Sequence, residues 1–299
     1  MNKDKITAMC RKVSNETGLT FNSVMTYYFL ESVLRKWSIS KYNDKFIFKG
    51  GYILSNIVGL DSRSTVDIDF LFKNMPLTEE LLVEIFDDIL EYNEKDSIQY
   101  ELKGIQEIKK QDEYGGYRIQ ILCKLDNIRQ IVPLDIATGD ILTYKPVDYE
   151  YKTIFSEDNL KIKAYNLETM LAEKLETIYS KGFLNSRSKD FYDIHLIYRF
   201  KSNDVDFEKL SKACERTFDY RGTILDFASF KEMIDIILAD KGFNDMWKAY
   251  ANKNNYVKEI SFENVIESLI LTWIIHIIFN KTIKLCILKH YTGVAFYTY

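Results

Sequence analysis

Residues 46–51 read Phe-Ile-Phe-Lys-Gly-Gly, and residues 66–70 read Val-Asp-Ile-Asp-Phe. The first stretch is a short apolar run ending at a double glycine, which predicts a strand, a tight turn and a short helix to about Val58. The second stretch alternates apolar and acidic residues, so it predicts a strand with Asp67 and Asp69 on one face and apolar side chains toward a core. This part of the chain is therefore predicted to contribute to a mixed α/β sheet.

The sheet region extends on both sides of this segment. Helical spacing of apolar residues covers residues 5–37, with Asn22 or Ser23 as the predicted cap of its second segment. An amphipathic helix is predicted from Pro76 to about Tyr92. Further strands are predicted at residues 98–102, 117–122 and 128–136. Residues 1–150 are accordingly predicted to form an α/β domain with N-terminal helices.

The second half of the chain has a helical pattern. Asn166 and Gly182 are the predicted N-cap and C-cap of one helix, and Ser188 is the predicted cap of another that runs to about Phe200. Further helices are predicted near residues 206–218, 230–239, 244–251 and 261–279. Residues 151–299 are therefore predicted to form a helical domain, and the fold class is α+β.

The composition excludes several classes of protein. The net charge of −4 argues against a protein that coats nucleic acid without specificity, although a local basic groove remains compatible with it. The four cysteines form no CxxC pair and the three histidines are scattered, so neither a zinc site nor a disulfide framework is expected. The N-terminus lacks a signal-peptide pattern, and the longest apolar stretch, residues 269–279, is shorter than the ~20 residues of a membrane helix. We expect a cytoplasmic protein without a membrane partner.

The chemistry is concentrated in the segment quoted first. A double glycine lets the backbone approach phosphate groups, and the following helix N-terminus adds a positive dipole. Carboxylates side by side, as at Asp67 and Asp69, are costly unless a cation compensates them, and Mg²⁺ binds carboxylates and phosphates together. Asp135 on a neighbouring strand is the predicted third carboxylate, with Asp140 as the alternative. Each feature alone is commonplace, since a double glycine is usually a turn and Asp-x-Asp often a solvated strand edge, but their combination is specific.

Together, Gly50-Gly51, Asp67-x-Asp69 and Asp135 resemble the DNA polymerase β-like nucleotidyltransferase superfamily. The helical half narrows the resemblance. Its motifs are Glu173-Lys174-Leu175-Glu176 and Arg187-Ser188-Lys189-Asp190-Phe191-Tyr192-Asp193, and they resemble those of the AbiEii/AbiGii-type toxins, including the MenT-like enzymes. The resemblance extends from about Phe46 to Tyr198.

The resemblance implies a function. It implies a Mg²⁺-dependent nucleotidyltransferase toxin of a type IV toxin–antitoxin or abortive-infection system, acting in phage defence. Such an enzyme would transfer NMP from an NTP, either GTP or a pyrimidine NTP, to the 3′ end of tRNA and release pyrophosphate. Its antitoxin would act genetically or indirectly. The implied fold is a nucleotidyltransferase-type mixed sheet with flanking helices, followed by a helical domain.

The resemblance also implies roles for individual residues. Asp67, Asp69 and Asp135 would bind the metal and take part in catalysis. Lys174 and Asp190 would be the catalytic residues of the helical half. Gly50, Gly51 and Ser64 would lie at the triphosphate. Lys49, Arg187 and Lys189 are the other candidate nucleotide-binding residues. One departure is that superfamily members often carry Gly-Ser at the turn, so the serine hydroxyl is missing here.

Local physical chemistry agrees with a function for the helical motif. Asp190 and Asp193 are three residues apart and share one helix face. Arg187 and Lys189 are cations at a helix start, where they oppose the helix dipole, so a local anion is expected. A phosphate-binding role and a merely solvated charged turn are both compatible with this pattern.

Three other functions use parts of the same pattern. A small-molecule, antibiotic-type nucleotidyltransferase would use the same metal site. A glycosyltransferase would use Asp-x-Asp for the metal of a nucleotide sugar, without needing the double glycine. A non-catalytic nucleotide-binding module would retain the fold without turnover.

Overall fold

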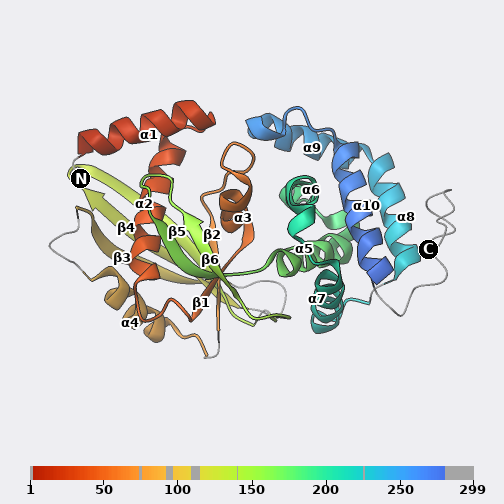
Figure 1. Cartoon of the computed structure of the whole chain (residues 1–299), viewed down its shortest axis with the longest axis horizontal. Helices are drawn as coiled ribbons and strands as arrows, with labels where there is room; N and C mark the ends of the chain where they lie inside the picture. The colour runs from red at the N-terminus through yellow and green to blue at the C-terminus, as the bar shows by residue number, and fades with distance from the viewer. Residues whose placement is uncertain are drawn as a thin grey trace. The chain divides into compact units, whose positions relative to one another are not determined.

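A mixed β-sheet organises the first part of the chain (Figure 1). The computed structural model describes residues 3–73, 76–91, 97–108, 115–139, 141–224 and 226–279. Within these ranges the sheet has seven strands in the order β3-β4-β5-β2-β1-β7-β6. The β2–β5 and β1–β7 pairs are parallel, and the other pairs are antiparallel. The strands are β1 (Phe46–Lys49), β2 (Ile68–Phe72), β3 (Gln99–Ile108), β4 (Gly116–Leu125), β5 (Ile128–Ala137), β6 (Val147–Lys152) and β7 (Asn159–Ala164).

Helices accompany the sheet in the same part of the chain. They are α1 (Lys3–Thr17), α2 (Phe21–Ser38), α3 (Gly50–Val58) and α4 (Glu79–Leu90). The N-cap of α2 is Thr20, whose hydroxyl accepts a hydrogen bond from the Ser23 amide at 3.2 Å. The prediction of Asn22 or Ser23 as this cap was wrong, because Thr20 already has the extended backbone of a cap while Asn22 and Ser23 lie inside the helix.

Aromatic side chains form the core between α2 and the sheet. The Trp37 ring lies 4.1 Å from the Phe46 ring and is stacked on Phe70 at 4.8 Å between centroids. Phe48 and Phe70 are register partners, and both are fully buried. Since side chains alternate between the faces of a strand, residues 47, 49, 69 and 71 belong to the opposite face of β1 and β2. The aromatic core therefore assigns Lys49 and Asp69 to the face away from it.

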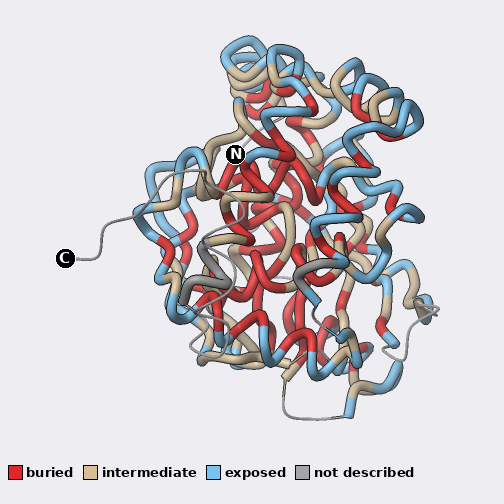
Figure 2. Tube along the Cα trace, turned by 90° about the vertical axis from the view of Figure 1, so that its right-hand side faces the viewer, coloured by how far each residue is buried: buried red, intermediate tan, exposed pale blue. Residues whose placement is uncertain are grey.

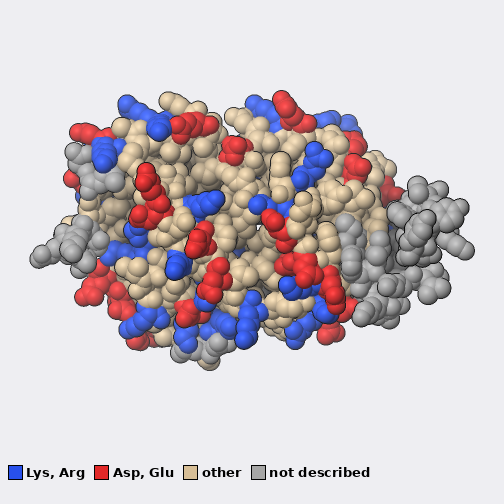
Figure 3. All heavy atoms as spheres, viewed as in Figure 1, with Lys and Arg blue, Asp and Glu red and all other residues tan. Residues whose placement is uncertain are grey.

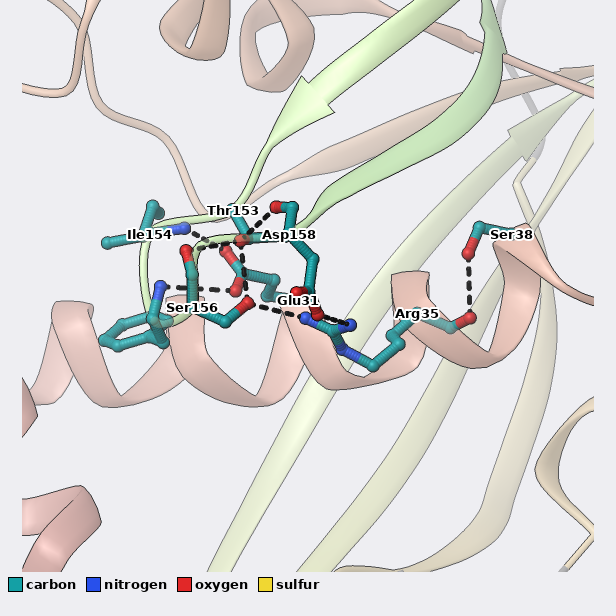
Figure 4. A network of polar contacts seen from close by, with 8 residues as sticks. Glu31, Arg35, Ser38, Thr153, Ile154, Ser156 and Asp158 are labelled. Carbon is teal, nitrogen blue, oxygen red and sulfur yellow. Dashed lines mark hydrogen bonds and ion pairs between the residues drawn. The ribbon is translucent and has the colours of Figure 1, made fainter.

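The β6–β7 hairpin completes the sheet and is tied to α2. The buried Glu31 carboxylate accepts hydrogen bonds from the Ile154 and Phe155 amides at 2.7 and 3.4 Å (Figure 4). One turn further along α2, Arg35 donates to Asp158 and Ser156, both at 2.8 Å. A polar network thus holds the loop of the hairpin against the helix.

This hairpin moves the boundary between the two parts of the chain. Contacts group Met1–Asp140 and Lys145–Tyr165 into one compact unit, and Ile141–Tyr144 and Asn166–Tyr299 into the other. The boundary predicted at residue 150 falls inside β6. Both β6 and β7 were missed, although their alternating polar and apolar residues are the period expected of antiparallel strands with one solvated face.

The second unit is helical. The Asn166 side chain accepts from the Thr169 amide at 3.0 Å and caps α5, which ends at Gly182, as predicted. Ser188 is the first residue of α6 rather than its cap; Arg187 holds the cap position without a side-chain capping bond. The helices are α5 (Leu167–Lys181), α6 (Ser188–Lys201), α7 (Phe207–Tyr220), α8 (Phe227–Ala239), α9 (Lys241–Lys253) and α10 (Phe262–Phe279), with short 3₁₀ turns at Gly182–Leu184, Ser202–Asp204 and Asn255–Val257.

Aromatic stacking also fills the core of the helical unit. The Trp273 ring of α10 lies 3.9 Å from the Phe230 ring of α8 and 5.6 Å from the Tyr179 ring of α5. Figure 2 shows buried positions in red along the interior of the trace and exposed positions in pale blue at its margins. None of the described helices, α10 included, combines the length and apolarity needed to span a bilayer. The sequence beyond Phe279 lies outside the described residues.

Candidate active site

Four charged side chains form a row across the strands of the sheet unit. Lys49 is the register partner of Asp69, Asp69 of Asp135, and Asp135 of Arg118. Direct cross-strand partners point to the same face, and neighbouring strands lie about 4.8 Å apart. The strands β1, β2, β5 and β4 thus place two adjacent carboxylates between two cations. We call these four residues the charged row.

Gly50 gives the turn after β1 its close approach to the charged row. Its φ of +77° is a conformation that residues with a side chain rarely adopt. A Cβ at this position would collide with the Oδ2 atom of Asp69. The turn and the carboxylate therefore share a space that only glycine leaves open, and α3 begins there.

Asp67 lies just outside the strand. The strand β2 begins at Ile68, and Asp67 is exposed in the preceding loop, with its amide donating to Thr65 Oγ1 at 3.2 Å. Ile68 and Phe70 are buried, as predicted from the alternation. That the carboxylates of Asp67 and Asp69 act as a pair stays a prediction.

The sequence interpretation missed Arg118. Its Nε donates to Oδ1 of Asp135 and its Nη2 to Oδ2, both at 2.7 Å, in a two-pronged ion pair. The Asp135 hydrogen bonds and charge, followed by the charges of Asp67 and Asp69, raise the pKa of the Arg118 guanidinium further above its usual value. A signal was present in the sequence, because the two-residue turn after Leu125 pairs Leu125 with Ile128, and counting seven residues outward on each strand pairs Arg118 with Asp135.

Lys49 and Ser64 are the remaining residues predicted in this unit, and Arg63, which was not predicted, lies beside the glycine turn. Lys49 is buried, and its Nζ lies 5.5 Å from the centre of the Tyr165 ring. The guanidinium of Arg63, which is only 4% exposed, lies 2.8 Å from the position that a Cβ of Gly51 would take. The Arg63 guanidinium also donates to the backbone carbonyl of Ser64 at 2.7 Å. This hydrogen bond holds the loop in which Ser64 lies half-buried.

The carboxylates of this unit provide a small donor set for a metal ion. Among the residues that the structure describes, no group of three or more His, Cys, Asp and Glu side chains converges closely enough to hold a metal ion. Mg²⁺ commonly takes one or two protein carboxylates and completes its shell with water and substrate phosphates. Asp67 and Asp69 fit that smaller donor set. Asp135 is adjacent but shares its carboxylate with Arg118, and Asp140 lies outside the described residues.

The helical unit contains a second cluster, centred on Lys174 of α5. Its Nζ lies 3.0 Å from Asp190 Oδ1 and 2.7 Å from Asp193 Oδ2 on α6. The three side chains are 11%, 4% and 1% exposed. Burial lowers the pKa of Lys174, but the two aspartates outweigh burial and raise it overall. Lys174 is therefore a fixed cation, and the predicted common face of Asp190 and Asp193 is confirmed.

Two further cations lie at the start of α6. Arg187 Nε is 2.9 Å from Asp190 Oδ2, an ion pair whose geometry does not align as a hydrogen bond. The Arg187 amide donates to the buried Asn185 side chain at 2.9 Å, which fixes the chain before the helix. Arg187 and Lys189 are both exposed, so they are accessible to an anion from solvent.

Comparisons with known proteins agree with these features. The family model described as "Nucleotidyl transferase AbiEii toxin, Type IV TA system" matches residues 32–268, which is most of the chain. No curated protein matches the chain.

Solved structures share the fold at low sequence identity. The nucleotidyltransferase toxin MenT4 from Mycobacterium tuberculosis H37Rv superposes with a TM-score of 0.53 and 12% identity, over 89% of this chain and 98% of that one. A protein from H. pylori proposed to be a nucleotidyltransferase superposes with a TM-score of 0.51 and 13% identity, over 89% and 97%. These likenesses confirm the predicted α+β fold. By its family match, the chain belongs to the AbiEii family of nucleotidyltransferase toxins of type IV toxin–antitoxin systems.

Proposed function

We propose that this AbiEii-family enzyme transfers NMP from an NTP to the 3′ end of tRNA in a Mg²⁺-dependent reaction, and that this arrests growth as part of phage defence. The observation that carries the metal-dependent step is the pair of adjacent register partners Asp69 and Asp135 beside a glycine turn at a helix N-terminus. The tRNA acceptor and the NTP, either GTP or a pyrimidine NTP, come from the family resemblance. A cognate antitoxin acting genetically or indirectly follows from the same resemblance.

The glycine turn would hold the triphosphate of the NTP. The amides of Gly50 and Gly51 begin α3, where backbone N–H groups have no partner within the helix and favour an anion. Lys49 directly precedes this turn and would add a cation, and Ser64 lies in the loop after α3 and would add a hydroxyl. Bound Mg²⁺ would supply charge neutralisation at the phosphates and at the attacking oxygen.

The carboxylates would organise the reacting groups. The acceptor hydroxyl oxygen forms a bond to the α-phosphorus, the bond from that phosphorus to the bridging oxygen breaks, and pyrophosphate leaves with the bonding electrons. Asp67 and Asp69 would be the metal ligands. Asp135 would either bind the metal on the acceptor side or take the hydroxyl proton.

The helical cluster has roles of its own in the proposal. From the resemblance we assign catalytic roles to Lys174 and Asp190 and triphosphate contacts to Arg187 and Lys189. The ion pairs of Lys174 with Asp190 and Asp193 make it a positioned, permanently charged group, as electrostatic stabilisation requires. Arg187 and Lys189 are exposed, so phosphates can reach them from solvent.

The surface charge bears on how RNA would bind. On the face displayed in Figure 3, Lys and Arg side chains are interspersed with Asp and Glu. Together with the net charge of −4, this distribution supports local contacts to an RNA end rather than binding along a broad basic surface.

The test is a transfer assay. Purified protein is incubated with Mg²⁺, total RNA and each of the four α-labelled NTPs in turn. We expect label on tRNA-sized RNA with one NTP, and its loss in the Asp67→Ala/Asp69→Ala variant. The matched control is Glu84→Ala/Asp87→Ala, which removes the same charge from exposed positions of α4. Label on a small molecule or on the protein instead of RNA would contradict the proposed acceptor, and retained transfer in the Asp67→Ala/Asp69→Ala variant would contradict the proposed site.

A further inference from the structure

The Arg118–Asp135 pair has the geometry of a strong ion pair at the end of the charged row. Both carboxylate oxygens of Asp135 accept from the guanidinium at 2.7 Å. The Asp135 side chain is 25% exposed and the Arg118 side chain 48%, so water screens this pair only in part. Two parallel hydrogen bonds also fix the orientation of the carboxylate plane.

The positive charge of Arg118 extends its influence beyond Asp135. Asp67 and Asp69 attract the same guanidinium through space. Asp69 also lies directly beside Asp135 across the parallel β2–β5 pair. Arg118 on β4 therefore offsets part of the mutual repulsion of these carboxylates, as Lys49 does on the other side of Asp69.

We propose that Arg118 is a built-in counter-cation that competes with divalent metal for these carboxylates, so that metal binds tightly only together with the nucleotide. The inference rests on the metal-dependent function proposed above and concerns this chain's own residues. Metal arriving alone meets a row whose charge is already partly neutralised, and it is repelled by the guanidinium. A bound nucleoside triphosphate adds several negative charges, which raise the affinity of the site for the metal.

The competition has a specific physical size. Two charges on a metal and one on a guanidinium, about 7 Å apart, repel enough to change an affinity by roughly tenfold even at the dielectric constant of water, about 80, and by more at a lower effective value. Removing the guanidinium charge should therefore strengthen metal binding to the nucleotide-free protein. If Arg118 instead served only to hold Asp135 as a metal ligand, its removal would weaken metal binding.

The experiment measures Mn²⁺ binding to the full chain without nucleotide or RNA, by the decrease of the free-ion EPR signal. We expect Arg118→Gln to tighten Mn²⁺ binding about tenfold relative to wild type. Arg129→Gln is the matched control, because Arg129 is exposed at the opposite end of β5, where its guanidinium donates to the backbone carbonyls of Asp126 and Ile128. It should leave the affinity unchanged.

Two further variants locate the effect. In Arg118→Gln/Asp67→Ala/Asp69→Ala the tightened binding should disappear, which places the ion at the carboxylates. In Arg118→Gln/Asp135→Asn it should be reduced, because the carboxylate released by the arginine is also neutralised. Thermal unfolding of each variant in EDTA verifies that it is folded before it is titrated.

The Mn²⁺ titrations test the role of Arg118 separately from the proposed transfer reaction. Unchanged or weakened Mn²⁺ binding in Arg118→Gln overturns the competition, and so does tightened binding that survives the loss of Asp67 and Asp69. Neither result bears on whether wild-type protein transfers label to RNA. Conversely, an absence of transfer with tightened Mn²⁺ binding would contradict the proposed acceptor chemistry and leave the counter-cation in place.

Discussion

Asp69 and Asp135 are direct register partners on the neighbouring parallel strands β2 and β5. Their carboxylates point to the face opposite the aromatic core, where like charges on adjacent strands destabilise a sheet unless a cation is near. The protein keeps this unfavourable arrangement and flanks it with Lys49 and Arg118. The two cations offset the repulsion between the carboxylates only in part, which leads to the first prediction.

Asp69→Asn should separate function from stability. The change removes one of the repelling charges, so we expect the metal-free protein to unfold at the same temperature as wild type or a higher one. Transfer should fall by at least about a hundredfold, as when a group that acts on the transition state is removed. Asp87→Asn on the exposed face of α4 is the control and should alter neither quantity. Wild-type transfer rates in Asp69→Asn would remove this residue from the site.

Gly50→Ala should damage the same site through the backbone. A φ of +77° costs a residue with a Cβ about 1–2 kcal/mol, and here the Cβ also meets the Asp69 carboxylate. Gly18→Ala isolates the first effect, because Gly18 has a φ of +70° and no atom within 4 Å of an added Cβ. Chemical denaturation of both variants should show the larger loss for Gly50→Ala. Equal losses would show that the carboxylate moves aside without cost.

Lys174→Met should destabilise the helical unit strongly. The substitution keeps the apolar stem and removes the charge that compensates Asp190 and Asp193, which are 4% and 1% exposed. Leaving buried carboxylates without their cation costs roughly 3–5 kcal/mol. Lys189→Met, at an exposed position of α6, should change the free energy of unfolding by less than about 0.5 kcal/mol. Urea unfolding measures both, and a change below 1 kcal/mol at Lys174, on the order of an exposed pair, would argue against a compensated buried cluster.

Glu31 should make stability depend on pH in the neutral range. Burial raises the pKa of Glu31 to about 7, although the amides of Ile154 and Phe155 and the charge of Arg35 act in the opposite direction. An acid whose folded pKa lies above its unfolded value stabilises the fold below the unfolded pKa. That contribution is lost as the pH rises through the folded pKa. Its size here is about 3 kcal/mol, lost between about pH 4.5 and pH 7.

The matching variant is Glu31→Gln, which cannot ionise and retains one acceptor oxygen. Urea unfolding at pH 5 and pH 8 should show a smaller loss of stability in Glu31→Gln than in wild type. Glu84→Gln, exposed on α4, should behave like wild type. An unchanged pH dependence in Glu31→Gln would place the responsible group elsewhere.

Local patterns in the sequence were sufficient for much of the fold. The strand, double glycine and helix at residues 46–58 were predicted because the apolar run and the glycines are adjacent in the chain, and the caps at Asn166 and Gly182 because capping is a local interaction. The β6–β7 hairpin was missed because its strands are short and carry charges at alternate positions, so no apolar run marks them.

The site was predictable to the extent that its residues are neighbours in sequence. Asp67 and Asp69 are two residues apart, and Asp190 and Asp193 are three apart, so one strand or helix period relates them. Arg118 and Asp135 meet only through strand pairing, and the partners of Glu31 lie more than a hundred positions further along the chain. Such contacts depend on how helices and strands pack against one another. The spacing of residues within one helix or strand does not show them.

The turn between β4 and β5 has a consequence for how the protein tolerates genetic change. Asp126 there has a φ of +50°, and the turn has only two residues, so every pair in the hairpin is counted from it. Replacing a turn residue leaves that count intact. Inserting or deleting one codon at the turn would slide β4 by one position and send Arg118 to the other side of the sheet. A frame-preserving single-codon indel, eight residues along the chain from both Arg118 and Asp135, would thereby dismantle the charge balance of the site while every residue of the charged row remained encoded.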